Sequence, residues 1–175
     1  MKPLFLFLNR SIQRLCSAAL AVSAVFIAIL ALIGAADIFG TSILSMPVPS
    51  AVEYSEAGLV IVVFMGLAQA QRRRAHITVD IVSAKFTGVA KNLSIGIAIV
   101  GAILFFGFIA WRSGFAAWDS VMIDERSMGQ MSFPVWPGKV LLFAGCAIAT
   151  LESLRQFAHL LLGTHEQDMR EQMGD

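Results

Sequence analysis

Two long stretches of this sequence carry no charged residue, and they constrain the possible folds more than any other feature. Residues 15–36 form an uncharged run of 22, and residues 92–111 form another of 20. About 20 predominantly apolar residues in a helix are enough to cross the hydrocarbon core of a bilayer. The sequence therefore predicts transmembrane helices at both places.

Two further segments are apolar but contain a few charges. Residues 50–71 carry Glu53 and Glu56 near their start, and residues 137–162 carry Lys139, Glu152 and Arg155. We expect both to cross the membrane as well. The predicted fold is an all-α integral membrane protein, a single domain over residues 1–162. Its four transmembrane helices cover residues 15–36, 50–71, 90–111 and 137–162, approximately.

The composition excludes several other classes of protein. Hydrophobic residues make up 57% of the chain and charged residues only 14%, whereas a soluble domain carries roughly a quarter of its residues as charge. This argues against a soluble enzyme and against a disordered chain. The formal net charge of +1 offers no electrostatic footprint for nucleic acid, so no nucleic-acid partner is expected.

The positions of Lys and Arg predict the orientation, because basic residues accumulate on the cytoplasmic side. With four spans and both termini cytoplasmic, ten basic residues lie inside and three outside. The first span is too long for a signal peptide and is expected to be an uncleaved anchor. The outer side would then also hold the tryptophans, which favour the headgroup level. These are Trp111, Trp118 and Trp136.

Helix starts and connections give further expectations. Ser50 and Glu53 have the spacing of a capping box at the start of the second span, and Pro137 suits the first turn of the fourth. Asp80 is placed to cap a short amphipathic helix over residues 80–90, which we expect to lie along the cytoplasmic interface between the second and third spans. Residues 163–175 are polar and predict a loose cytoplasmic tail.

Little in the sequence points to catalysis or to a bound cofactor. Cys16 and Cys146 form no Cys-x-x-Cys pair and suit small packing positions. A membrane-anchored haem subunit would need histidines facing each other within the spans, and His76, His159 and His165 do not provide them. We therefore expect no enzyme activity, no cofactor and no metal site.

Ionisable residues within membrane spans are functional candidates. Glu53 and Glu56 share one helix face. They either stabilise the helix start or contact a partner, or else Glu56 couples a cation in a self-sufficient small transporter. Glu152 and Arg155 are three residues apart and are expected to pair. The basic run of the second loop either binds anionic headgroups and sets the orientation or also positions a partner subunit. That run is Arg72, Arg73 and Arg74.

The most distinctive segment runs from the second span into the loop after it. Glu53-x-x-Glu56 is followed by Phe64-Met65-Gly66-Leu67-Ala68, by the arginine run, and by His76-Ile77-Thr78-Val79-Asp80. The fourth span is approached by Phe133-Pro134-Val135-Trp136-Pro137 and contains Gly145 and Leu154-Arg155. In these features, over residues 10–162, the chain resembles the small membrane subunit of the tripartite ATP-independent periplasmic (TRAP) transporters, the DctQ-like proteins.

The resemblance implies a role as a scaffold in the bacterial inner membrane. In such transporters a periplasmic binding protein delivers a solute, commonly a carboxylate. A large membrane subunit carries the substrate and sodium sites. The small subunit supports the large one, so both other components are expected partners, together with anionic lipid headgroups. His76 and Asp80 either belong to the local structure of the loop or contact the large subunit. Candidate contact residues are Glu53, Glu56, Arg72, Arg73, Arg74, His76, Asp80, Trp111, Trp136 and Arg155.

Overall fold

The computed structural model describes residues 2–73, 89–127 and 132–162, which form four long helices. These are α1 (Lys2–Leu44), α2 (Ala51–Arg72), α4 (Val89–Met122) and α5 (Trp136–Leu161). Each contains a stretch long and apolar enough to cross a membrane. The all-α fold with four membrane-spanning helices is therefore confirmed for the described residues.

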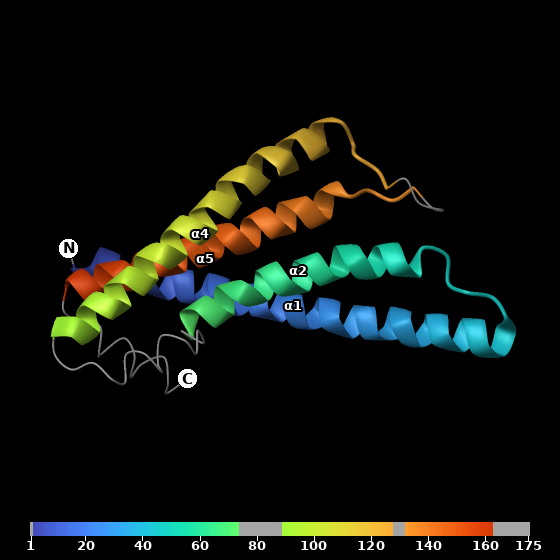
Figure 1. The fold of residues 1–175 in the computed structure, drawn as a ribbon, viewed down its shortest axis with the longest axis horizontal. Helices are drawn as coiled ribbons and strands as arrows, with labels where there is room; N and C mark the ends of the chain where they lie inside the picture. The colour runs from blue at the N-terminus through green and yellow to red at the C-terminus, as the bar shows by residue number, and fades with distance from the viewer. Residues whose placement is uncertain (1, 74–88, 128–131, 163–175) are drawn as a thin grey trace.

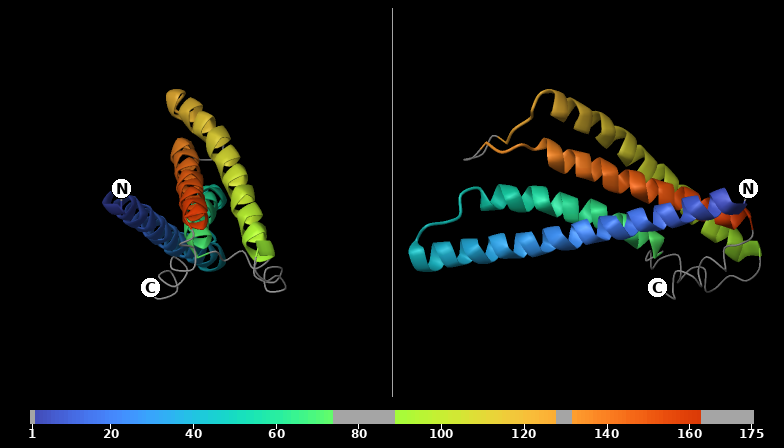
Figure 2. Two further views of the ribbon diagram at one scale, coloured as in Figure 1. Left: turned by 90° about the vertical axis from the view of Figure 1, so that its left-hand side faces the viewer. Right: turned by 180° about the vertical axis from the view of Figure 1, so that it is seen from behind.

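The helices pair into two antiparallel hairpins, α1 with α2 and α4 with α5 (Figure 1). The hairpins meet where α2 and α5 pack together, and α1 also contacts α5. They converge at one end of the molecule and diverge toward the other (Figure 2). The start of α1 and the end of α5 lie at the converging end, as an even number of crossings requires.

Two helices extend well beyond the uncharged runs. At ~1.5 Å per residue, α1 is about 65 Å long and α4 about 51 Å, against a hydrocarbon core of roughly 30 Å. The sequence predicts a loop over residues 37–49, but α1 continues through its first part to Leu44. Only residues 45–50 connect α1 to α2. Asp37 lies inside α1, where its Oδ1 accepts a hydrogen bond from the Val48 N–H at 2.9 Å. Charges end a membrane span but do not by themselves end a helix.

The predicted capping box at the start of α2 is wrong. Ser50 has a left-handed backbone with φ 58° and makes no side-chain cap. The Ala51 N–H donates to the Val48 carbonyl at 3.3 Å. Residues 48–51 thus form a turn in which Pro49 is the second residue and Ser50, with its positive φ, is the third. This pattern fits a type II turn, so the turn determines the conformation of Ser50. Pro137 does lie in the first turn of α5, as predicted.

Small side chains fill the narrow core. Ala19, Ala68 and Ala149 are buried together with Ile61, Met65 and Phe106. The Ser23 hydroxyl of α1 donates to the Val62 carbonyl of α2 at 2.9 Å. Small residues let helices approach closely, which is how helices associate in a membrane, where no hydrophobic effect drives their association.

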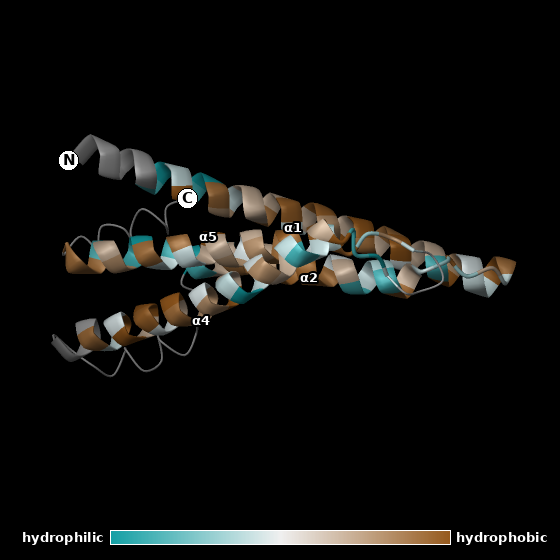
Figure 3. Ribbon diagram, turned by 90° about the horizontal axis from the view of Figure 1, so that it is seen from above, coloured by the Kyte–Doolittle hydropathy of each residue, from teal (hydrophilic) through white to brown (hydrophobic). Residues whose placement is uncertain are grey.

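The outer faces of the helices remain apolar. Figure 3 shows brown, hydrophobic residues along all four helices, with teal, polar residues in smaller patches between them. The clearest case is α4, which packs against α5 and leaves a stripe of large apolar side chains exposed. This stripe comprises Leu93, Ile97, Leu104, Phe108, Trp111, Phe115, Trp118 and Met122. In water such a surface would aggregate, whereas in a membrane it suits lipid or another subunit.

Three sequence predictions fall largely outside the described residues. The interfacial helix over 80–90 lies there, except that Val89 and Ala90 belong to the start of α4. The tail over 163–175 and the candidate residues Arg74, His76 and Asp80 also lie outside.

Candidate functional site

A cluster of polar side chains is buried on α5 at the converging end of the bundle. Glu152, Arg155 and Gln156 have the three- and four-residue spacing that places side chains on one helix face. Glu152 is fully buried, and Gln156 and Arg155 are only 1% and 5% exposed. Residues of this type are rarely buried unless they are paired, so their partners determine what the cluster does.

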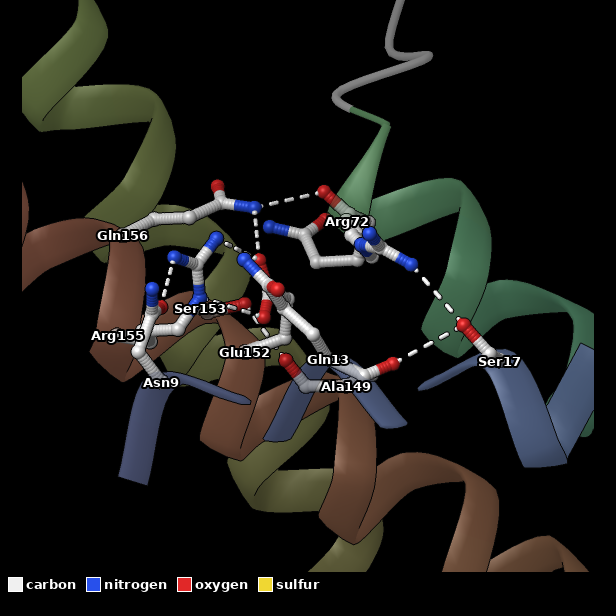
Figure 4. A network of polar contacts seen from close by, with 10 residues as sticks. Asn9, Gln13, Ser17, Arg72, Ala149, Glu152, Ser153, Arg155 and Gln156 are labelled. Carbon is white, nitrogen blue, oxygen red and sulfur yellow. Dashed lines mark hydrogen bonds and ion pairs between the residues drawn. The ribbon is translucent and has the colours of Figure 1, made fainter. Parts of the chain in front are cut away.

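Glu152 and Arg155 form the ion pair expected from the sequence (Figure 4). Arg155 donates through Nη2 to Oε1 at 2.7 Å and through Nε to Oε2 at 2.9 Å. Two parallel bonds of this kind fix the planes of both groups as well as their separation. The pair carries no net charge, which lowers the cost of placing it among apolar helices.

The ion pair also connects α5 to the other hairpin. Arg155 Nη1 donates to Oδ1 of Asn9 in α1 at 2.5 Å. Gln156 Nε2 donates to Glu152 at 2.9 Å and to the backbone carbonyl of Gln71 in α2 at 2.8 Å. One helix face of α5 thus holds the start of α1 and the end of α2, and the three helices are joined at a single point.

A second polar link joins α1 and α2 directly beside the cluster. Arg72 Nη1 donates to the Ser17 hydroxyl at 3.0 Å, and that hydroxyl donates to the Gln13 carbonyl at 3.1 Å (Figure 4). The arginine run predicted to face the cytoplasm therefore begins within the converging end of the bundle.

Above the cluster, α5 and α2 approach each other very closely at Gly145. A Cβ atom at this position would lie 2.6 Å from the Phe64 carbonyl carbon and 3.1 Å from the Met65 nitrogen. Real Cβ atoms do not approach backbone so closely, so glycine is required here for steric reasons. Both segments belong to the motifs noted in the sequence.

The diverging end has its own contacts. Tyr54 of α2 packs against Phe133 of the loop between α4 and α5, with ring centroids 5.0 Å apart. Lys139 pairs with Glu125 across the base of that loop. The hydrogen bond from Lys139 lowers the pKa of the Glu125 carboxyl. Glu125 therefore stays ionised, and keeps this pair, somewhat below its ordinary pKa of 4.5.

The other predicted site residues do not join the buried cluster. Glu53 is half-buried in the first turn of α2, and Glu56 is exposed one turn further on. Arg73 is exposed at the end of α2. Trp111 is 67% exposed, but α4 continues for another 11 residues, about 16 Å. Trp111 thus lies well before the end of its helix, whereas Trp136 begins α5.

The sequence predicted the ion pair but not three other members of the cluster. Asn9, Gln71 and Gln156 were not among the candidates, although Gln156 directly follows Arg155. Four polar residues among the five from Glu152 to Gln156, in an otherwise apolar span, were a usable signal for Gln156. No local pattern pointed to Asn9, which lies 146 positions away from Arg155.

Across residues 2–73, 89–127 and 132–162, no three His, Cys, Asp or Glu side chains gather as a metal site would require. The polar groups of the buried cluster are engaged with one another and with backbone, which makes it a structural junction. It fixes how the two hairpins meet.

Comparison with known proteins identifies a family. Residues 30–163 match the family model described as "Tripartite ATP-independent periplasmic transporters, DctQ component". No curated protein and no solved structure matches the chain. The matched region covers α2, α4 and α5 and the last third of α1, and it includes Glu152, Arg155 and Gln156.

Proposed function

The chain belongs to the DctQ component family of the tripartite ATP-independent periplasmic transporters, and we propose that it is the small scaffold subunit of a sodium-coupled importer. The importer takes up organic solutes, carboxylates above all, delivered by a periplasmic binding protein. The large subunit performs the transport. The chain itself is a multi-pass membrane protein, and we place it in the bacterial inner membrane.

The main support for this proposal is that the buried charged side chains are paired with each other. In the described part of the chain, the ion pair with both partners buried is Glu152–Arg155, at 0% and 3% side-chain exposure. Both groups are held by fixed bonds within the bundle. The polar groups of a transport site must be able to release their protein partners and bind a passing ligand. In a scaffold, the polar groups instead stay bound to one another and hold the helices in place.

The distribution of basic residues supports cytoplasmic termini. Arg10, Arg14, Arg72 and Arg73 gather at the converging end. At the diverging end Arg126 and Lys139 are each paired with an acid, Asp124 and Glu125 respectively. Excess positive charge marks the cytoplasmic face. We therefore place the converging end inside and the loop between α4 and α5 outside.

A self-sufficient cation-coupled transporter using Glu56 is not favoured. Glu56 lies in the second turn of α2 and is exposed on the outside of the bundle. A coupling carboxylate needs a protected path past it, facing the bundle interior or a water-filled cavity.

Affinity purification tests the scaffold role directly. A tagged copy of the chain, expressed at its native level, should co-purify from membranes with a much larger multi-span membrane protein. Deleting the chain should abolish binding-protein-dependent solute uptake, because the large subunit loses its support. A chain that purifies alone, together with unchanged uptake after its deletion, would reject the proposal.

A further inference from the structure

One face of α2 is left exposed when the four described helices pack together. The helix contacts α1 and α5 (Figure 1), and its remaining face carries four exposed side chains. Their spacing of four, three and four residues places them in one stripe along the helix. They are Val52, Glu56, Leu59 and Val63. Three apolar side chains of this stripe therefore lie beside one carboxylate.

The register between α1 and α2 places Glu56 inside the apolar band of the bundle. A Cβ atom at Gly58 would lie 2.6 Å from Cδ2 of Leu30, so these two residues are level in the antiparallel pair. Glu56 is two residues nearer the start of α2 and is therefore about level with residue 32 of α1. That residue lies within the uncharged run of α1, four residues from its end, or about 6 Å.

Glu56 has no partner of its own in the described part of the chain. No ion pair and no side-chain hydrogen bond joins it to another residue of the ranges 2–73, 89–127 and 132–162. An ionised carboxylate only accepts hydrogen bonds, and lipid tails offer no donor. Charged side chains in membrane spans almost always face protein or water instead. The α2 stripe therefore suits a protein neighbour that supplies a donor.

The exposed stripe of α4 differs in this respect. Within the uncharged run 92–111 it consists of large apolar and aromatic side chains, namely Leu93, Ile97, Leu104, Phe108 and Trp111. Lipid covers such a surface without leaving a charge unpaired, whereas on α2 it would leave Glu56 unpaired. The two exposed stripes thus differ in polarity, and the stripe of α2 is the one that requires a polar partner.

We propose that the α2 stripe is the docking face for a membrane-spanning helix of the large subunit, and that this helix is apolar except for a hydrogen-bond donor opposite Glu56. The proposal rests on the proposed scaffold function, because it names the face through which the support acts. Close packing and interhelical hydrogen bonds drive helix association in membranes. The apolar side chains of the stripe supply the packing, and the donor fixes the register of the two helices.

The affinity of the full chain for the large subunit tests this docking face. Purified large subunit is titrated in detergent onto the tagged chain. Glu56→Leu removes the acceptor and leaves the donor of the partner unpaired, so the affinity should fall roughly tenfold, the effect of losing one hydrogen bond to a charged group. Glu56→Gln keeps an acceptor oxygen and the shape of the side chain, so it should bind like the unaltered chain.

Leu59→Ala and Leu104→Ala form a matched pair. Each shortens an exposed leucine on a helix stripe, the first on α2 and the second on α4. Leu59→Ala should weaken binding of the large subunit, and Leu104→Ala should not. Glu56 and both leucines are exposed in the isolated chain, so its unfolding temperature should be similar in every variant. That measurement separates an effect on docking from an effect on folding.

Two results would overturn the docking face and leave the scaffold role in place. One is unchanged affinity in Glu56→Leu, and the other is an equal loss of affinity in Leu59→Ala and Leu104→Ala. An unaltered chain that binds no large subunit would reject the scaffold role and the docking face together.

Discussion

Arg155→Met is expected to lower the free energy of unfolding by about 3–5 kcal/mol, the cost of leaving one member of a buried ion pair unpaired. Glu152 is fully buried and receives two hydrogen bonds from Arg155. Methionine occupies similar space but donates no hydrogen bond. The Asn9 contact to α1 is lost in the same substitution, so the junction of the two hairpins loosens. Thermal unfolding in detergent, followed by size-exclusion chromatography, measures the loss.

Arg126→Met is the control for this prediction. Arg126 also pairs with a carboxylate, Asp124, but both side chains are more than half exposed. Exposed pairs contribute only ~0–1 kcal/mol, so the unfolding temperature should barely change. The double variant Glu152→Gln/Arg155→Met should be more stable than Arg155→Met alone, because no buried charge remains unpaired. Equal, small effects of Arg155→Met and Arg126→Met would contradict the assignment of the cluster as the junction.

Gly145→Ala is expected to lower the free energy of unfolding by about 1–3 kcal/mol, the usual range for overpacking a core. The added methyl group meets the backbone of α2 at Phe64 and Met65. Backbone cannot rotate away as the end of a flexible side chain can, so α2 and α5 must separate. Since these helices connect the two hairpins, assembly into the transporter should fall together with stability. The same unfolding assay, with co-purification of the large subunit, measures both.

Gly101→Ala provides the matched comparison. Gly101 is also a glycine inside a long helix, α4, but an added Cβ there meets nothing within 4 Å. Alanine is the better helix former by roughly 1 kcal/mol, so Gly101→Ala should be neutral or slightly stabilising. If Gly145→Ala were equally neutral, the close approach of α2 and α5 would not be present in the folded protein.

The four membrane spans were predictable because the signal is chemical and local. A run of about 20 apolar residues has few alternatives to a membrane helix, and all four segments were found. Their true lengths were not predictable in the same manner. The helix α1 continues through Arg10, Arg14 and Asp37, because hydropathy reports where the chain is apolar and not where its backbone hydrogen bonding stops.

The ion pair of the buried cluster could be predicted from the sequence, but its links to other helices could not. The spacing of Glu152 and Arg155 within one helix revealed their pairing, since three residues make nearly one turn. Their links to Asn9 and to the Gln71 carbonyl depend on which helices are neighbours. Periodicity identifies the face of a helix but not what that face contacts. Gly145 shows the same limit, because its requirement for glycine comes from Phe64 on another helix.

The most direct test of the scaffold role is solute uptake into liposomes under an inward sodium gradient with the loaded binding protein outside. We expect uptake when the large subunit and this chain are present together, and none when this chain is present alone. We also expect full uptake when the chain carries Glu56→Gln. Cation or solute movement by this chain alone, abolished by Glu56→Gln, would contradict the scaffold role.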